Sequence, residues 1–87
     1  MTSLSRRLLP STAALAAFES VARLRSFSAA AEELSLTQGA ISRQVSGLEE
    51  QIGVLLFERT SRGVVLTSAG ADYAKAVGAA LSQIRSA

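Results

Sequence analysis

The chain has 87 residues, enough for one domain with a small hydrophobic core but too few for an additional ligand-binding or catalytic domain of typical size. It contains no cysteine and no histidine, which excludes disulfides and thiolate metal sites and removes the commonest general base. Nine lysine and arginine residues against seven acidic ones give a formal net charge of +2, so affinity for nucleic acid depends on where the cations lie more than on their total.

Residues 1–10 are expected to form a flexible arm. Arg6 and Arg7, followed by an alanine-rich stretch, loosely resemble a twin-arginine export signal. Pro10 and the charge at Glu19 interrupt the apolar region that such a signal requires, so we favour the start of a helix instead. No apolar run approaches the roughly 20 residues needed to cross a bilayer. We therefore expect no membrane contact and a place in the cytoplasm.

The first two helices are predicted where a serine or threonine precedes apolar residues at helical spacing. Ser11 or Thr12 can cap a first helix that ends near Leu24. Its apolar stripe is formed by Leu15, Phe18, Val21 and Ala22. Ser26 or Ser28 can cap a short second helix. Its apolar face is formed by Phe27, Ala30, Ala31 and Leu34. Both faces are expected in the core.

A third helix is predicted between Thr37, its cap, and Gly53, after a turn at Ser35 and Leu36. Its apolar residues recur at helical spacing and are expected to be buried: Ile41, Val45, Leu48 and Ile52. The opposite side, with its flank and first turn, then carries Gly39, Arg43, Ser46, Glu50, Ser42 and Gln38. The polar groups near the start of this helix suit base edges or phosphates, whereas the acidic groups lie at its far end.

The next segment predicts a small hairpin, or wing. A strand-like run over residues 55–59 is followed by a turn at 60–63 and a second run at 64–67. Arg62 lies at the tip, where a cation can enter the minor groove or meet a phosphate. Arg59 is interpreted as a residue that flanks the strand and supports the structure.

A last helix is predicted from Thr67 or Ser68 to about residue 85. One of its sides carries Tyr73, Val77, Leu81 and Ile84. Because the domain is small, it has little other core for these side chains to cover. We therefore expect them to contact the same helix of a second chain. The alternative, packing against the first helix of the same chain, is expected to share part of that face.

Together these elements predict a mainly α winged helix-turn-helix with a three-helix core, a small β-hairpin wing and a long C-terminal linker helix. The expected boundaries are the arm over 1–10, the winged helix-turn-helix over 11–67 and the linker or dimerisation helix over 68–87. In such a fold the helix over about 37–52 enters the major groove of double-stranded DNA.

Several side chains of that helix are candidates for contact with DNA. Arg43 can donate a bidentate pair to guanine or bind a phosphate, and Gln38 can pair with adenine. Gly39 would let DNA approach the backbone closely. Thr37 is first a cap, with a phosphate contact in addition. Small hydroxyl groups are offered by Ser42 and Ser46. The alternative for each is an ordinary solvated or capping side chain.

The neighbouring carboxylates Glu32–Glu33 and Glu49–Glu50 do not indicate acid–base catalysis, because adjacent side chains on a helix diverge by about 100°. We interpret both pairs as solvated surface. The sequence has no phosphate-binding glycine loop, nucleophile elbow or metal-ligand cluster. It therefore predicts no enzyme, cofactor or metal.

Six motifs follow one another along the chain: FESVA at 18–22, SFSAAAEEL at 26–34, TQGAISRQV at 37–45, LEEQIG at 48–53, LFER at 56–59 and LTSAG at 66–70. In this order and spacing they resemble the N-terminal DNA-binding domain of LysR-type transcriptional regulators. The resemblance implies a winged helix-turn-helix, a linker helix that pairs two chains, and binding to a pseudo-palindromic operator in promoter DNA.

The resemblance also implies which positions contact DNA. They are Gln38, Gly39, Ser42 and Arg43 on the third helix, Arg62 on the wing, and Ser28, which meets a phosphate at the start of the second helix. The chain departs from the family pattern at Ser46, where relatives often carry a basic residue, and at Gly39, where serine or proline is common. Family members continue into an effector-sensing domain of about 200 residues, absent here, and a higher oligomer is expected of the full-length protein. The alternative is a protein-interaction module that holds a partner without touching DNA.

Overall fold

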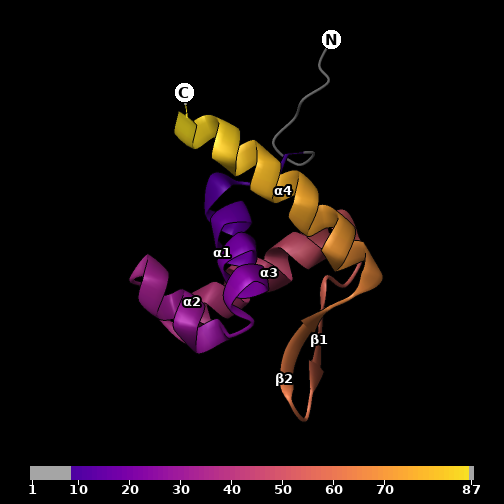
Figure 1. Ribbon diagram of the computed structural model, residues 1–87. Helices are drawn as coiled ribbons and strands as arrows, with labels where there is room; N and C mark the ends of the chain where they lie inside the picture. The colour runs from indigo at the N-terminus through magenta and orange to yellow at the C-terminus, as the bar shows by residue number, and fades with distance from the viewer. Residues whose placement is uncertain (1–8, 87) are drawn as a thin grey trace.

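The computed structural model describes residues 9–86, which form four helices and a two-stranded antiparallel sheet. In chain order the elements are α1 (Thr12–Leu24), α2 (Phe27–Leu34), α3 (Gln38–Ile52), β1 (Phe57–Thr60), β2 (Gly63–Leu66) and α4 (Ser68–Ser86). The first three helices pack on one another, the hairpin extends away from them, and α4 lies across α1 (Figure 1). This arrangement confirms the mainly α winged helix-turn-helix with a C-terminal helix. The arm predicted over residues 1–10 falls, except for its last two residues, outside the described range.

Local hydrogen bonds begin the first three helices where the sequence predicts. Backbone N–H groups of the first turns are accepted, at 3.0–3.1 Å, by the side-chain oxygens of Ser11, Ser26 and Thr37. Of the two serines proposed for α2, Ser26 is therefore the cap and Ser28 is not. The chain turns sharply into the next helix after α1 and after α2, because Arg25 (φ 56°) and Ser35 (φ 57°) adopt the left-handed conformation.

The core is built around Phe18 of α1, which is completely buried. The centroid of its ring lies 5.3 Å from that of Phe57 at the base of the wing and 5.4 Å from that of Tyr73 on α4. One aromatic side chain thus joins the three helices to the wing and to α4. The buried apolar side of α1 comprises Ala14, Ala17, Phe18 and Val21. The predicted Leu15 and Ala22 lie at its partly buried edge, where they pack against this core.

The apolar seam of α3 points inward, as predicted, except at its last residue. Ile41, Val45 and Leu48 are at most 3% exposed. Ile52 was predicted to continue the seam, and this prediction is wrong, since it is 38% exposed. Ile52 ends the helix beside Gly53 (φ 85°), where the chain turns away from the core toward the wing.

The wing is an antiparallel hairpin whose register pairs Phe57 with Leu66 and Thr60 with Gly63. Its turn therefore has two residues, and Gly63 takes a φ of 125°, which glycine adopts without a steric cost. The strands are slightly displaced from the predicted runs, because residues 55–56 belong to the connection from α3 instead.

Glu49 holds the connection between α3 and the wing. Its Oε2 accepts the backbone N–H groups of Leu56 and Phe57 at 2.8 and 3.2 Å. The side chain is consequently partly buried. The interpretation of Glu49 and Glu50 as solvated surface is therefore wrong for Glu49, because the connecting backbone needs a hydrogen-bond acceptor there.

α4 begins at its predicted cap, since Oγ1 of Thr67 accepts a backbone N–H of the first turn at 2.9 Å. Val77 is buried, and Tyr73 and Leu81 are partly buried against the same core. Of the four side chains predicted to contact a second chain, Ile84 alone is largely free, with 63% exposure. Val77 is thus covered by the domain's own core, with α1 on one side of α4, as the alternative of packing within the chain predicts. A contact of Tyr73, Leu81 and Ile84 with a second chain stays a prediction.

An ion-pair network ties α1 to α2. Nε of Arg23 lies 2.9 Å from Oε2 of Glu19, and the same guanidinium also donates to the carboxylate of Glu33. Ser20, which is completely buried, donates its hydroxyl to Oε2 of Glu33 at 2.9 Å. Glu33 is exposed, as interpreted, and on that surface its carboxylate also accepts hydrogen bonds from two side chains of α1.

This network makes stability depend on pH. Hydrogen bonds from Arg23, and then from Ser20, lower the pKa of Glu33 below its ordinary value of 4.5. A lowered pKa stabilises the folded state at pH values above the pKa of the unfolded chain, and this contribution is lost as the pH falls through the folded-state pKa. We expect Glu33→Gln to lower Tm at neutral pH, and the difference from the unaltered protein to shrink as the pH falls below about 4.5.

Thermal unfolding followed by circular dichroism measures this difference at each pH. Glu32→Gln is the matched control, because Glu32 is an exposed neighbour with no ion pair among residues 9–86, and it should change Tm little at any pH. A Tm difference for Glu33→Gln that stays constant with pH would contradict the assigned role of its charge.

Candidate nucleic-acid interface

The outer side of α3 is exposed because its inner side is fixed in the core. Ile41 and Val45 are buried where α3 packs on α1 and α2. Three residues in the first half of the helix are exposed: Gln38, Gly39 and Arg43. A Cβ atom added to Gly39 would lie 3.5 Å from Nη1 of Arg43, so the guanidinium lies along the first turn of the helix. An amide, a guanidinium and a bare stretch of backbone therefore share one surface.

An open hollow of about 260 Å³ lies beside this end of α3. It is lined by Phe27, Gln38, Gly39, Ser42 and Arg59. Three of the predicted DNA-contacting residues thus lie together with two residues, from α2 and β1, that were not assigned to the site. Cζ of Arg59 lies 4.5 Å from the centroid of the Phe27 ring. Arg59 was given only a supporting role in the strand, and the structure shows that it also borders the candidate site.

The position of Arg59 beside the candidate site could have been predicted from the alternation of side chains along β1. Residues two apart on a strand point to the same face, and Phe57 and Arg59 are two apart on β1. Since Phe57 belongs to the core, Arg59 points toward the body of the domain. No comparable signal identified Phe27, because an apolar residue on the inner face of α2 is expected to be core.

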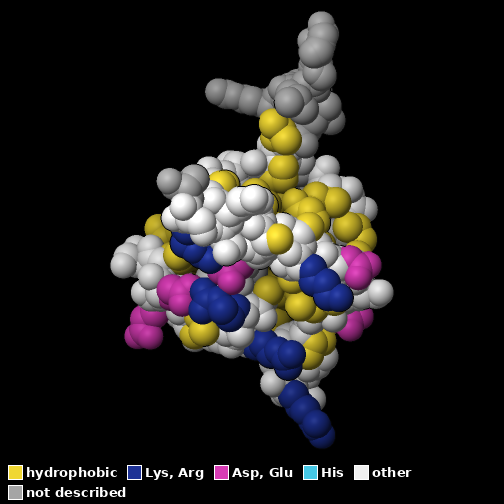
Figure 2. Space-filling view, turned by 45° about the horizontal axis from the view of Figure 1, so that its top comes forward, with side chains coloured by type: hydrophobic (Ala, Val, Ile, Leu, Met, Phe, Trp, Pro, Cys, Tyr) yellow, Lys and Arg dark blue, Asp and Glu magenta, His cyan; other side chains and the backbone are white. Residues whose placement is uncertain are grey.

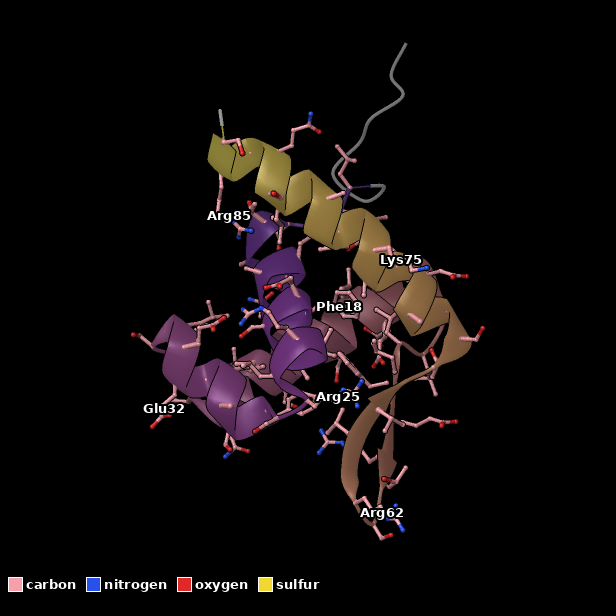
Figure 3. The ribbon with its side chains drawn as sticks, in the orientation of Figure 1. Phe18, Arg25, Glu32, Arg62, Lys75 and Arg85 are labelled. Atoms are coloured by element: carbon pink, nitrogen blue, oxygen red, sulfur yellow. The ribbon has the colours of Figure 1, made fainter. Side chains whose placement is uncertain are left out.

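Arg62 lies at the far end of the wing from the helical core (Figure 3). Thr60 orders this turn, since its Oγ1 accepts the backbone N–H of Arg62 at 3.2 Å and its hydroxyl donates to the carbonyl oxygen of Gly63 at 3.2 Å. The Arg62 side chain is exposed, and no carboxylate of residues 9–86 lies within ion-pair distance of it. Its charge is therefore free to meet a ligand.

The three remaining candidates occupy different environments. Thr37 caps α3 as predicted and is exposed. Ser28 is exposed in the first turn of α2, where its Oγ lies 3.2 Å from that of Ser26. Ser46 is also exposed, but it lines a second hollow, of about 370 Å³, together with two carboxylates at the far end of α3. The structure therefore separates Ser46 from the group around the first turn of the helix.

The arginines fall into two electrostatic groups. Hydrogen bonds to Glu19 and then Glu33 raise the pKa of Arg23 and compensate its charge. Within the described part of the chain, five others have no carboxylate at ion-pair distance: Arg25, Arg43, Arg59, Arg62 and Arg85. In Figure 2 basic side chains continue down to the lower tip of the molecule, whereas acidic side chains lie to either side. Four of these five arginines lie at the end of α1, on α3 and on the wing, whereas Arg85 lies at the end of α4 that is remote from the wing (Figure 3).

These groups supply hydrogen-bond donors and positive charge, which suit phosphates and the edges of bases. Over residues 9–86 there is no cluster of three or more histidine, cysteine, aspartate or glutamate side chains that could hold a metal ion. None of the helices in this range has the length and apolar character needed to span a membrane.

Sequence comparison relates the chain to bacterial regulators. The model of the family described as "Bacterial regulatory helix-turn-helix protein, lysR family" matches residues 12–71. The chain is 53% identical over 79 residues to the HTH-type transcriptional regulator TrpI of Pseudomonas aeruginosa, covering 91% of this chain and 27% of that protein. It is 49% identical over 73 residues to the RuBisCO operon transcriptional regulator of Allochromatium vinosum, covering 80% and 24%. The chain thus spans about a quarter of the length of these relatives.

Comparison with solved structures gives the same result. The crystal structure of the BenM DBD in complex with catB site 1 DNA superimposes with a TM-score of 0.84 at 34% identity. The match covers 87% of this chain and 85% of that one, so it includes the helices and the wing together.

Proposed function

The chain belongs to the LysR family of bacterial regulatory helix-turn-helix proteins, as the DNA-binding domain of such a regulator, and from this we propose how it binds DNA. α3 enters the major groove with Gln38, Gly39, Ser42 and Arg43 toward the bases and phosphates. The wing places Arg62 in the flanking minor groove or on its backbone. Ser28 and Thr37 meet phosphates beside the groove, and Ser46 lies farther along α3.

The observation that carries this proposal is the orientation of α3. Its apolar seam is buried, and its outer side presents donors that no carboxylate of residues 9–86 neutralises. A protein-interaction module on the same scaffold would not require an unpaired guanidinium both on α3 and at the wing tip. Because the BenM DBD is found on DNA with this fold, double-stranded DNA is the better-supported partner.

We expect the domain to select a preferred sequence from a pool of random duplexes and to lose affinity steeply with salt. Each phosphate neutralised by an arginine releases condensed counterions, so log K falls against log salt with a slope of about −0.9 per contact. Fluorescence anisotropy with the selected duplex and a scrambled duplex, over a series of salt concentrations, measures affinity and slope. Failure to retain any duplex at low salt would favour the protein-interaction alternative.

We also propose that two copies pair through α4 and bind the two halves of a pseudo-palindromic promoter site. The support is Ile84, which projects from the distal half of α4 at 63% exposure, beside exposed alanines that would permit close helix contact. In the full-length protein we propose that residues 68–87 link the domain at 11–67 to an effector-sensing domain, that a higher oligomer forms, and that it works on the nucleoid in the cytoplasm.

We expect Ile84→Asp to shift a dimer of this domain toward monomer, because the change places a charge in the proposed apolar contact. Sedimentation velocity at several concentrations measures the shift. Ser82→Asp, which adds the same charge at an exposed position on another side of α4, is the matched control and should leave the association unchanged. Equal sedimentation of both variants and the unaltered domain would contradict the assignment of Ile84.

A further inference from the structure

Arg59 is the end of a chain of aromatic contacts that starts in the core. The ring of Phe18 packs on Phe57 with 5.3 Å between centroids, and Phe57 packs edge-on against Phe27 at 6.1 Å. Phe27 in turn carries the guanidinium of Arg59 over its face at 4.5 Å. A buried side chain, a strand residue and a helix residue therefore define where this one cation lies.

The guanidinium keeps its charge and its donors available. The face of an aromatic ring attracts the cation without accepting its in-plane N–H groups in the way a carboxylate does. Arg59 has no carboxylate at ion-pair distance among residues 9–86, and its side chain is exposed at the edge of the hollow. The Phe27 ring thus holds the guanidinium in place without using the N–H groups that can bind a ligand.

The hollow beside Arg59 offers mainly donors. Its polar lining is the amide of Gln38, the hydroxyl of Ser42 and the guanidinium of Arg59, with bare backbone at Gly39. It lies on the flank of α3, between that helix and the stem of the wing, whereas base edges meet the front of a recognition helix. A convergent set of donors on the flank suits a phosphate oxygen, which accepts several hydrogen bonds at once.

We propose that Arg59 binds a backbone phosphate of the DNA strand that borders the groove entered by α3, and that Phe27 is the positioning residue that holds it there. The proposal rests on the proposed function, because the phosphate belongs to the duplex that α3 occupies. It assigns to the stem of the wing a DNA contact separate from that of Arg62 at the tip.

The test compares Arg59→Ala and Arg59→Gln with Arg85→Ala. Arg85→Ala is the control, because it removes the same charge from the end of α4 that is remote from the wing (Figure 3). We expect both Arg59 variants to bind the selected and the scrambled duplex about tenfold more weakly, by the same factor for each. The salt slope should fall by about 0.9, whereas Arg85→Ala should match the unaltered domain. Circular dichroism identifies any unfolded variant, and Arg59→Gln keeps most of the side-chain stem if Arg59→Ala does not fold.

Two results would overturn the phosphate contact. One is an Arg59 variant that binds both duplexes as Arg85→Ala does. The other is a variant that loses preference at a single base pair while the scrambled duplex binds unchanged, because that pattern belongs to a base contact. If the unaltered domain binds no duplex at all, the proposed function fails instead, so the two failures are distinguishable.

Phe27→Leu tests the positioning role, since leucine keeps an apolar side chain but removes the ring face. We expect Phe27→Leu to weaken duplex binding about threefold in the unaltered domain and to have no further effect when Arg59 is already glutamine. A purely structural role would lower the affinity by the same factor in both backgrounds, and that result would overturn the assignment.

Discussion

Replacing Gly70 with alanine is expected to destabilise the domain by about 3 kcal/mol or more. Gly70 lies in the first part of α4, where the helix backbone passes directly over the connection between α3 and the wing. A Cβ atom there would lie 2.0 Å from the carbonyl oxygen and 2.9 Å from the carbonyl carbon of Leu56, and 3.0 Å from Cδ2 of Leu66. The first distance is far shorter than a van der Waals contact, so the backbone must move.

The Leu56 carbonyl cannot rotate away without further losses. It accepts the backbone N–H of Thr67 at 2.9 Å, and the N–H of Leu56 itself donates to Glu49. The Leu56 side chain is 1% exposed. The alternative movement, a shift of α4, would separate Tyr73 from Phe18 and open the core. Either response removes contacts that a small domain of marginal stability needs.

Urea denaturation followed by circular dichroism measures the loss. Gly78→Ala is the matched control, because Gly78 lies on the same helix and an added Cβ meets nothing within 4 Å. That variant should be unchanged or more stable by up to about 1 kcal/mol, because alanine has the higher helix propensity. A Gly70→Ala protein within about 1 kcal/mol of the unaltered domain would show that α4 and the wing are not packed as described.

The parts of the fold that depend on neighbouring residues could be predicted from the sequence. A hydroxyl at Ser11, Ser26 or Thr37 accepts an N–H only three residues on, so each cap needs no distant partner. The inner seam of α3 was predictable for a similar reason, because helical periodicity alone places Ile41 and Val45 on one side.

The errors concern residues whose environment is set by distant segments. Periodicity continues the seam to Ile52, but the core ends before that residue. Val77 lies on the apolar side of α4, which the sequence alone does not place against any other element. Its burial within the chain follows from the crossing of α4 over α1. Glu49 is expected on the helix surface from its place in α3 alone, but in the structure it accepts the backbone N–H groups of Leu56 and Phe57 in the connection to the wing.

The candidate site divides in the same way. Gln38, Gly39 and Arg43 follow from the orientation of α3 and are exposed where the sequence predicts. Arg59 and Phe27 meet only because the wing packs on α2, so their contact could not be derived from either segment alone. The general lesson is that one helix can be oriented from its own pattern, whereas a cluster between helix and hairpin requires the tertiary packing.

Replacing Arg43 with alanine is expected to weaken binding of the selected duplex by about 1–3 kcal/mol, or about 10- to 100-fold. Arg43 lies on the exposed side of α3, about one turn from Gly39, and its Nη1 lies over the first turn of the helix. It has no carboxylate partner among the described residues, so no internal ion pair has to be broken before it binds. Its position on the front of the helix favours a base edge over a phosphate.

Arg43→Lys separates the two kinds of contact, because lysine keeps the charge but cannot donate the two parallel hydrogen bonds that guanine accepts. For a base contact, this variant should lose most of the affinity for the selected duplex, keep that for the scrambled duplex, and relax the preference at one base pair. Anisotropy titrations on both duplexes and a repeated selection from the random pool measure these quantities. If Arg43→Lys restores full affinity and Arg43→Ala weakens both duplexes equally, Arg43 binds a phosphate. If Arg43→Ala binds as tightly as the unaltered domain, α3 does not present this side to DNA, because no other guanidinium is available on that helix.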